Sequence, residues 1–305
     1  MPMHQDTLIA VTGATGAVGT RVSARLAKVG ARQRLVVRNA SRAPQHAGME
    51  VRQAAGYGAD EEMRVALQGA DTIFLIPAAE TPDRVQQHKT AVDAALAAGV
   101  GRIVYLSFFG AAPDATFTLA RDHWHTEAHI RATGVPWTFL RMNLYIDFIP
   151  SMVLPEGVIK GPAGHGRLAA ILRDDVAAAA AAVLTSNGHD GRTYDLTGRE
   201  AFSLAQAAGL MSRLTSKAIR FQDETDEEAF ASRAVFGAPD FEVRGWISSY
   251  QAIRDGSLEA VSPHMCELTG REPVTLAQYL QAHPEALDHI TGARAPNDPQ
   301  GTGTP

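Results

Sequence analysis

Short apolar runs alternate with amphipathic segments from the beginning of the chain. Residues 7–12 (TLIAVT) form a β-branched run, which is typical of a strand buried on both faces. The apolar side chains that follow recur with the spacing of an amphipathic helix, at Val18, Val22, Leu26 and Val29. Gly30 is a suitable C-terminal cap for that helix, and residues 34–38 (RLVVR) form a second strand. The pattern predicts a strand–helix–strand unit.

The same alternation continues to about residue 145. Further strands are predicted at 72–76, 102–107 and 136–141, with helices at 83–99 and 119–133. Strands that are separated by helices indicate a parallel sheet, whose ligands bind beyond the carboxyl ends of the strands. We therefore predict an α/β fold built on a Rossmann-type doubly wound parallel sheet.

The pattern weakens in the second half of the chain. Residues 157–168 are rich in glycine and predict a loop with one short strand. After them we expect a helix at 176–184, a returning strand at 193–197 and mainly helical structure at 203–290, with a strand near 218–222. The predicted domains are an NAD(P)-binding Rossmann domain at 1–150 with a returning segment near 174–200, a smaller α/β substrate domain at 151–290, and a disordered tail at 291–305.

A glycine-rich turn joins the first strand to the first helix. Residues 13–19 (GATGAVG) space the glycines as GxxGxxG, in the context that a dinucleotide-binding unit requires. The glycines permit a tight turn, a close backbone approach to a pyrophosphate and tight packing of helix on strand. Free amides at the helix N-terminus then bind the phosphates. The expected pyrophosphate site consists of Gly13, Thr15, Gly16, Val18 and Gly19.

The residues after the second strand decide the type of cofactor. An NAD site normally places an acid there to accept hydrogen bonds from the ribose hydroxyls. This chain has Arg38, and no acid occurs between Leu35 and Gln45. A carboxylate would repel a 2′-phosphate, whereas Arg binds one bidentately. The sequence favours NADP(H), with Arg38 as its reader; the alternative is that Arg38 is an ordinary solvated strand-end residue.

Composition and charge exclude several other classes of protein. The 305 residues carry a formal net charge of −5, spread thinly, so that a nucleic-acid partner is not expected. A single cysteine, Cys266, excludes an intramolecular disulfide and a multi-cysteine zinc site. No apolar run reaches the ~18 residues of a membrane span, and the first six residues do not resemble a signal peptide. We expect a soluble cytoplasmic protein without a membrane partner.

Four stretches resemble one known family in content and order. They are VTGATGAVG, VVRNASRA, DHWHTEAHIRATGVPWTFLRMNLYIDF, and LRDDVAAAAAAVL with GRTYDLTG. The chain resembles the NmrA-like atypical short-chain dehydrogenases/reductases, and within them the bacterial NADPH:quinone and triphenylmethane reductases. The resemblance implies a Rossmann domain, a smaller C-terminal domain, a cleft between them for an aromatic acceptor, and NADPH as hydride donor.

The chain departs from the pattern of ordinary short-chain dehydrogenases. Their catalytic Tyr-x-x-x-Lys pair is missing, and His123 and Glu127 stand at comparable positions, as in the reductases it resembles. Those relatives have Asn directly after the Arg of the FLR strand, where this chain has Met142 followed by Asn143. Their ADYGD stretch is altered here, with an apparent insertion, at residues 55–60. Hydride transfer needs no protein nucleophile, so these departures do not exclude reduction.

Three residues are the candidates for catalysis. Ser107 ends a sheet strand and is placed to hydrogen-bond an acceptor carbonyl, or it is an ordinary strand-end serine. His123 is placed to protonate a reduced oxygen, or it is a satisfied structural histidine. Tyr145 would line an aromatic pocket together with Phe108, Phe109 and Phe148, and its hydroxyl would orient a carbonyl; the alternative is that these rings belong to the core. Pro77 is expected to contact the nicotinamide.

The histidine pair at His125 and His129 does not form the HExxH pattern of zinc enzymes, and the sequence shows no third ligand. No metal site is therefore predicted. The expected activity is NADPH-dependent hydride transfer to a quinone or similar conjugated aromatic acceptor, by a monomer or homodimer. Two alternatives stay open: a regulator that senses NAD(P) without turning it over, and a tailoring reductase of natural products on the same fold.

Overall fold

The computed structural model describes residues 7–46 and 48–292. Within these ranges the main sheet has seven strands, all parallel, in the order β3-β2-β1-β4-β5-β6-β8. The strands are β1 (Ile9–Thr12), β2 (Gln33–Val37), β3 (Met49–Gln53), β4 (Thr72–Leu75), β5 (Arg102–Phe108), β6 (Trp137–Met142) and β8 (Arg192–Leu196). This order confirms the predicted doubly wound Rossmann sheet.

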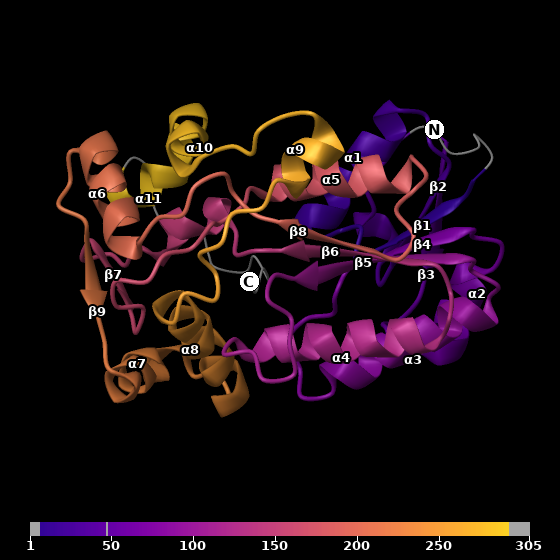
Figure 1. Cartoon of the computed structure of the whole chain (residues 1–305), viewed down its shortest axis with the longest axis horizontal. Helices are drawn as coiled ribbons and strands as arrows, with labels where there is room; N and C mark the ends of the chain where they lie inside the picture. The colour runs from indigo at the N-terminus through magenta and orange to yellow at the C-terminus, as the bar shows by residue number, and fades with distance from the viewer. Residues whose placement is uncertain (1–6, 47, 293–305) are drawn as a thin grey trace.

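Helices cover both faces of the sheet, as Figure 1 shows. One face carries α1 (Ala17–Lys28), α5 (Arg173–Leu184) and the short α9 (His264–Thr269), and the other carries α2 (Asp60–Leu67), α3 (Arg84–Ala97) and α4 (Thr118–Ala132). Because both faces are covered, the central strands are fully buried and read as continuous apolar runs. Two large hydrophobic clusters lie one on each side of the sheet, and a small third cluster joins α7 to α8.

Strand β3 and helix α2 are not predicted by the sequence pattern. The side chains of β3 are half-buried or exposed, because it is the edge strand, so that its composition carries no buried run. Helix α2 has only eight residues, with three acids in its first turn, and offers little apolar periodicity. Both elements lie between the first two predicted strands and the third, so their absence left the predicted order of those strands unchanged.

The C-terminal half lies beyond the carboxyl ends of the central strands (Figure 1). A small parallel sheet pairs β7 (Val158–Gly161) with β9 (Arg220–Asp223), which confirms the two short strands expected there. Around it are η2 (Ile146–Met152), α6 (Leu204–Thr215), α7 (Asp226–Arg233), η3 (Ala234–Phe236), α8 (Asp240–Arg254), α10 (Leu276–Ala282), η4 (Pro284–Leu287) and α11 (Asp288–Thr291). Helix α9, although late in the chain, packs on α5 and β8 of the main sheet.

The returning segment connects the two parts of the molecule. Helix α5 packs against α1, and β8 pairs with β6 at the sheet edge. The division into domains at residue 150 stays a prediction. The predicted tail begins at Thr291, which ends α11, and its residues 293–305 lie outside the described part of the chain. None of the described helices is both long and apolar enough to cross a membrane.

Candidate active site

The glycine-rich turn between β1 and α1 is built so that its backbone approaches a ligand. Gly13 has φ +60°, and a Cβ added there would lie 3.2 Å from the Cβ of Ile76. A Cβ on Gly19 would lie 2.3 Å from the carbonyl oxygen of Gly13, so that only glycine lets the helix approach the turn. Gly16 caps α1 without a side-chain hydrogen bond, and Thr15 beside it is exposed. This leaves exposed amides at a helix N-terminus, which fits a pyrophosphate.

The remaining predicted cofactor residues lie along the same edge of the sheet. The side chain of Val18 is buried in the core, so it can offer a ligand only its amide. Arg38 directly follows β2 and is exposed. Its neighbour Asn39 accepts a hydrogen bond from the Ser41 amide, which starts a short helical turn. An exposed guanidinium at this strand end fits a 2′-phosphate.

Tyr57, which belongs to the altered stretch 55–60, joins two of these strand ends. Its hydroxyl lies 2.5 Å from the carbonyl oxygen of Ile76 and 2.6 Å from the hydroxyl of Thr12. The hydroxyl of Thr12 also accepts from the amide of Ile76, at 3.0 Å. These contacts hold the residues that precede Gly13 and Pro77 in a fixed relation.

The loop after β4, which begins with Ile76 and Pro77, is held by polar contacts from α3. The amide of Ala78 donates to Nε2 of His88 at 2.9 Å, and the carbonyl of Ala78 accepts from Nε of Arg84 at 3.0 Å. Pro77 is half-buried between these anchored residues. The loop therefore presents a fixed backbone at the carboxyl edge of the sheet.

His123 lies inside a buried polar network beneath that loop. Its Nδ1 is 2.9 Å from the hydroxyl of Tyr105, and its Nε2 is 3.3 Å from the guanidinium of Arg84. Burial and the nearby Arg84 hold the pKa of His123 well below its ordinary value, and the same causes act on His88. Both imidazoles are therefore neutral at pH 7.

Ser107 is likewise buried, at the end of β5. Its hydroxyl donates to Glu127 at 2.6 Å. Glu127 is fully buried and forms ion pairs with Arg141 at 2.6 Å and Arg131 at 2.9 Å. We call these four residues the Glu127 cluster. It ties α4 to the ends of β5 and β6, next to the edge where the ligand is expected.

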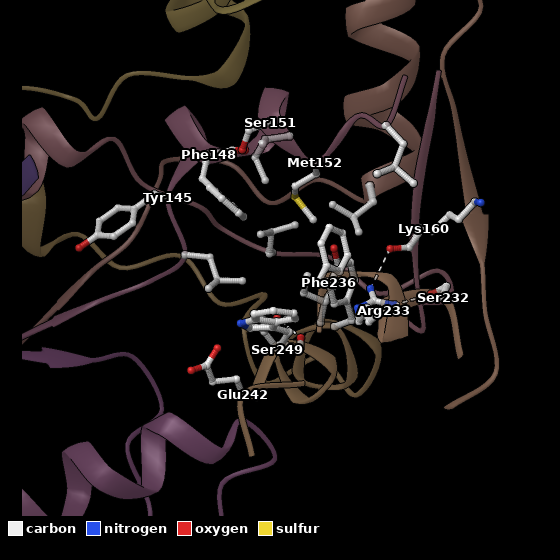
Figure 2. A pocket seen from close by; sticks show the side chains of 18 of the residues that line it. Tyr145, Phe148, Ser151, Met152, Lys160, Ser232, Arg233, Phe236, Glu242 and Ser249 are labelled. Carbon is white, nitrogen blue, oxygen red and sulfur yellow. Dashed lines mark hydrogen bonds between the residues drawn. The ribbon is translucent and has the colours of Figure 1, made fainter. Parts of the chain in front are cut away.

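A cavity of about 870 Å³ lies between η2, η3, β7 and α8, next to the end of β6. Figure 2 shows its apolar interior, with Phe148 and Met152 on one side and Phe236 opposite. Its aromatic and sulfur-containing lining residues are Tyr145, Phe148, Met152, Phe236, Trp246 and Tyr250. The size and the apolar lining suit a planar conjugated ligand.

Tyr145 lies on the wall of this cavity, with its hydroxyl pointing away from the other lining residues (Figure 2). The guanidinium carbon of Arg173 lies 4.1 Å from the centre of its ring. Burial raises the pKa of Tyr145. Of the other aromatic residues considered from the sequence, Phe148 lines the cavity, whereas Phe108 packs in the core against Phe117.

The described residues contain no group of three metal-ligating side chains. Nε2 of His129 contacts Asp93 at 2.8 Å, and the ring of His125 packs edge-on against Trp124. Both histidines thus have ordinary partners on the outer surface of α4 and α3.

A profile of the NmrA-like family matches residues 5–269. The chain belongs to the NmrA-like family. It is 34% identical over 278 residues to quinone oxidoreductase 2 of Escherichia coli K12, across 89% of this chain and 96% of that protein. It is also 34% identical over 286 residues to (4-alkanoyl-5-oxo-2,5-dihydrofuran-3-yl)methyl phosphate reductase of Streptomyces griseus, across 92% of this chain and 99% of that protein.

Solved structures of NmrA-like reductases share the fold. The crystal structure of the NADPH-dependent quinone oxidoreductase QOR2 of E. coli, complexed with NADPH, matches with a TM-score of 0.83 at 34% identity, over 90% of this chain and 99% of that one. Triphenylmethane reductase of Citrobacter sp., complexed with NADP(H), matches with a TM-score of 0.81 at 31% identity, over 90% and 99%. The resemblance seen in the sequence is confirmed.

Asn143, one residue later than in the pattern of the reductases that the sequence resembles, has a structural role in this NmrA-like chain. It is fully buried, and its side-chain amide donates to the carbonyl of Leu258 at 3.0 Å. Its side-chain carbonyl accepts from the amide of Leu144 at 2.8 Å. Asn143 therefore ties the end of β6 to the segment after α8.

Sequence reasoning missed the part of the cavity wall that comes from α8 and from the loop after β4. Trp246 and Tyr250 lie four positions apart on α8, and this aromatic pair at helical spacing was the available signal. Glu80 lies three residues beyond Pro77 and is buried at the cavity wall. Nothing in its local sequence distinguishes it from a surface acid.

Proposed function

We propose that this NmrA-like protein is an NADPH-dependent reductase of quinones or similar conjugated aromatic acceptors. The observation that carries the proposal is the aromatic cavity of about 870 Å³, which lies next to the carboxyl edge of a Rossmann sheet with an intact dinucleotide turn. Ligand sites of doubly wound folds lie at this edge. The similarity to quinone oxidoreductase 2 covers 89% of this chain and supports an oxidoreductase activity of the same class.

NADP(H) is the cofactor of this oxidoreductase, as in the complexes of its structural neighbours with NADPH and NADP(H). The NADPH, when bound, supplies the hydride. The amides of residues 13–19 would hold the pyrophosphate, and Arg38 would hold the 2′-phosphate. Pro77 would contact the nicotinamide.

The cavity residues bind and orient the acceptor and exclude water from it. The rings of Tyr145, Phe148 and Trp246 provide apolar surface for a planar acceptor. The ring of Tyr145 is fixed by Arg173, so that in this proposal it positions the acceptor. The catalytic roles of Ser107 and His123 stay predictions; their polar atoms are engaged within the buried networks.

The test is the loss of NADPH absorbance when purified protein is mixed with a panel of quinones and cationic triarylmethane dyes, with NADH in parallel. We expect acceptor-dependent oxidation of NADPH that is at least about tenfold faster than that of NADH, the minimum expected for a phosphate–Arg contact. Tight NADPH binding without consumption by any acceptor would overturn the proposal and favour the cofactor-sensing alternative. Turnover only with a furanone or another enone would favour the tailoring reductase instead.

A further inference from the structure

Glu80 is a buried acid that faces the cavity. It lies in the loop after β4, is 9% exposed and lines the cavity wall. Its Oε1 is buried and has no hydrogen-bond partner among the described residues. Gly245 of α8 has no side chain, and a Cβ added to it would lie 3.3 Å from Oε2 of Glu80. The carboxyl of Glu80 occupies the space that a larger residue at position 245 would narrow. An unpaired buried oxygen at the wall of a ligand cavity requires a partner from the ligand or the solvent.

The charged groups around Glu80 come from three helices, and none of the described residues forms an ion pair with it. Arg84 of α3 contacts the carbonyl of Ala78 at 3.0 Å, Asp122 of α4 at 3.2 Å and Nε2 of His123 at 3.3 Å. The guanidinium is thus committed to other partners, and its field lowers the pKa of Glu80 only in part. Burial, together with Glu242 of α8 and Asp122, raises the pKa of Glu80 to about 7.

Reduction of a quinone requires a proton at the acceptor oxygen, and Glu80 is an acid on the wall of the cavity. Transfer of a hydride leaves a negative oxygen on the acceptor, which must gain one proton to give the hydroquinone. Of the other acids on the wall, Glu156 is paired with Lys160 at 3.2 Å, and Glu242 is more exposed than Glu80. The hydroxyl of Tyr145 points away from the cavity and is a weak acid.

We propose that the carboxyl of Glu80 is the general acid that protonates the reduced acceptor, an inference that rests on the proposed reductase function. The acceptor gains two electrons as a hydride from NADPH, which is oxidised to NADP⁺. The O–H bond of Glu80 breaks, an O–H bond forms on the acceptor oxygen, and Glu80 becomes a carboxylate. Solvent returns the proton to Glu80 once the product leaves the open cavity.

The experiment compares two classes of acceptor with wild type and Glu80→Gln. A quinone needs a hydride and a proton, whereas a triarylmethane cation becomes neutral on gaining the hydride alone. Gln preserves the size of the side chain and removes its acidic proton. We expect the ratio of kcat for the quinone to kcat for the dye to fall about 100-fold in Glu80→Gln, the size of a general-acid contribution. Glu61→Gln, an exposed acid of α2 that does not line the cavity, is the control and should change the ratio less than about threefold.

Two further measurements separate chemistry from structure. The wild-type kcat for the quinone should decline above about pH 7, and this decline should be missing in Glu80→Gln. The infrared spectrum of wild type minus Glu80→Gln, without acceptor, should show a protonated-carboxyl band that disappears between about pH 5 and about pH 9. NADPH binding, followed by its fluorescence, reports whether the variant retains its fold.

The outcomes distinguish the two proposals. If wild type reduces neither quinone nor dye, the reductase function fails. If wild type reduces both but Glu80→Gln keeps the ratio, or if the carboxyl band is missing at every pH, the reductase function holds and Glu80 is not its acid. An equal loss of both rates with intact NADPH binding also overturns the assignment, because it indicates a positioning role.

Discussion

Two buried glutamates lie near the carboxyl edge of the sheet in opposite surroundings. Glu127 is fully buried and is met by Arg141, Arg131 and the hydroxyl of Ser107. Glu80 is nearly as buried but has one oxygen without a partner, and it faces a cavity. Three partners hold the carboxylate of Glu127 in place, whereas burial raises the pKa of Glu80 to about 7, so that it can exchange a proton near neutral pH.

The difference teaches how to separate structural acids from chemical ones in this molecule. Burial alone does not do so, because both side chains are removed from most of the solvent. The number of charged partners distinguishes the two acids, because a carboxylate whose oxygens are already bonded to protein groups has no capacity left for a ligand. The following predictions test the contrast in order of expected effect.

Removing the charge of Glu127 is expected to have the largest effect. Glu127→Gln leaves Arg141 and Arg131 without their shared carboxylate and should lower the free energy of unfolding by about 3 kcal/mol. Denaturant unfolding followed by circular dichroism measures this loss. The control is Glu61→Gln, an exposed pair with Arg64 on α2, which should change little. An unchanged midpoint in Glu127→Gln would contradict the structural role of the cluster.

The same contrast between a paired and an unpaired charged group holds for two arginines. Arg141 is paired, whereas Arg38 is exposed and forms no ion pair within the described residues. Arg38→Ala should raise KM for NADPH by about 10- to 100-fold, because a charge-assisted phosphate contact is lost, and leave KM for NADH nearly unchanged. Steady-state kinetics with both cofactors measure the split. Arg21→Ala, on the exposed side of α1, is the control. A parallel rise for both cofactors would show that Arg38 does not read the 2′-phosphate.

Glu80 should make stability depend on pH in a direction opposite to that of a paired acid. Its pKa is raised from 4.5 to about 7, so between these values the folded state binds more protons than the unfolded state. Stability is therefore lost as the pH rises through this window. Glu80→Gln should be more stable than wild type by about 2 kcal/mol at about pH 8, and equally stable near about pH 4.5. A difference that is constant with pH would mean that Glu80 titrates normally.

Removing the hydroxyl of Ser107 is expected to have the smallest effect, and it tests whether this residue has a structural role in the Glu127 cluster. Ser107→Ala removes one hydrogen bond to Glu127 and should lower the free energy of unfolding by about 1 kcal/mol. Thermal unfolding detects it, with NADPH oxidation measured in the same samples. Full stability together with a greatly reduced kcat would instead support contact between Ser107 and the acceptor.

The sequence predicts which edge of the sheet binds the cofactor, because the residues that indicate it lie close together in the chain. Gly13, Gly16 and Gly19 follow one strand and begin one helix, and Arg38 ends the next strand, so that spacing alone brings them to one edge. The resemblance to the NmrA-like family added the smaller C-terminal domain and the acceptor cleft. Tyr145 was proposed because it follows the predicted strand at 136–141 and carries a hydroxyl that could orient a carbonyl.

The acid at the cavity wall could not be found in the same way. Glu80 is buried because Gly245, more than 160 residues later, lacks a side chain beside it. Its pKa depends on charges from three helices that meet only in the folded chain. The sequence position of His123, a candidate proton donor or structural histidine, likewise does not show that Tyr105 and Arg84 contact its ring.

A crystal structure with NADP⁺ and a quinone analogue tests the central claim most directly. We predict that the analogue occupies the cavity beside Tyr145 and Phe148, next to the nicotinamide, with its carbonyl oxygen within about 3.2 Å of the Glu80 carboxyl. An analogue that binds outside this cavity, or with the carboxyl of Glu80 beyond the reach of its oxygen, would contradict it.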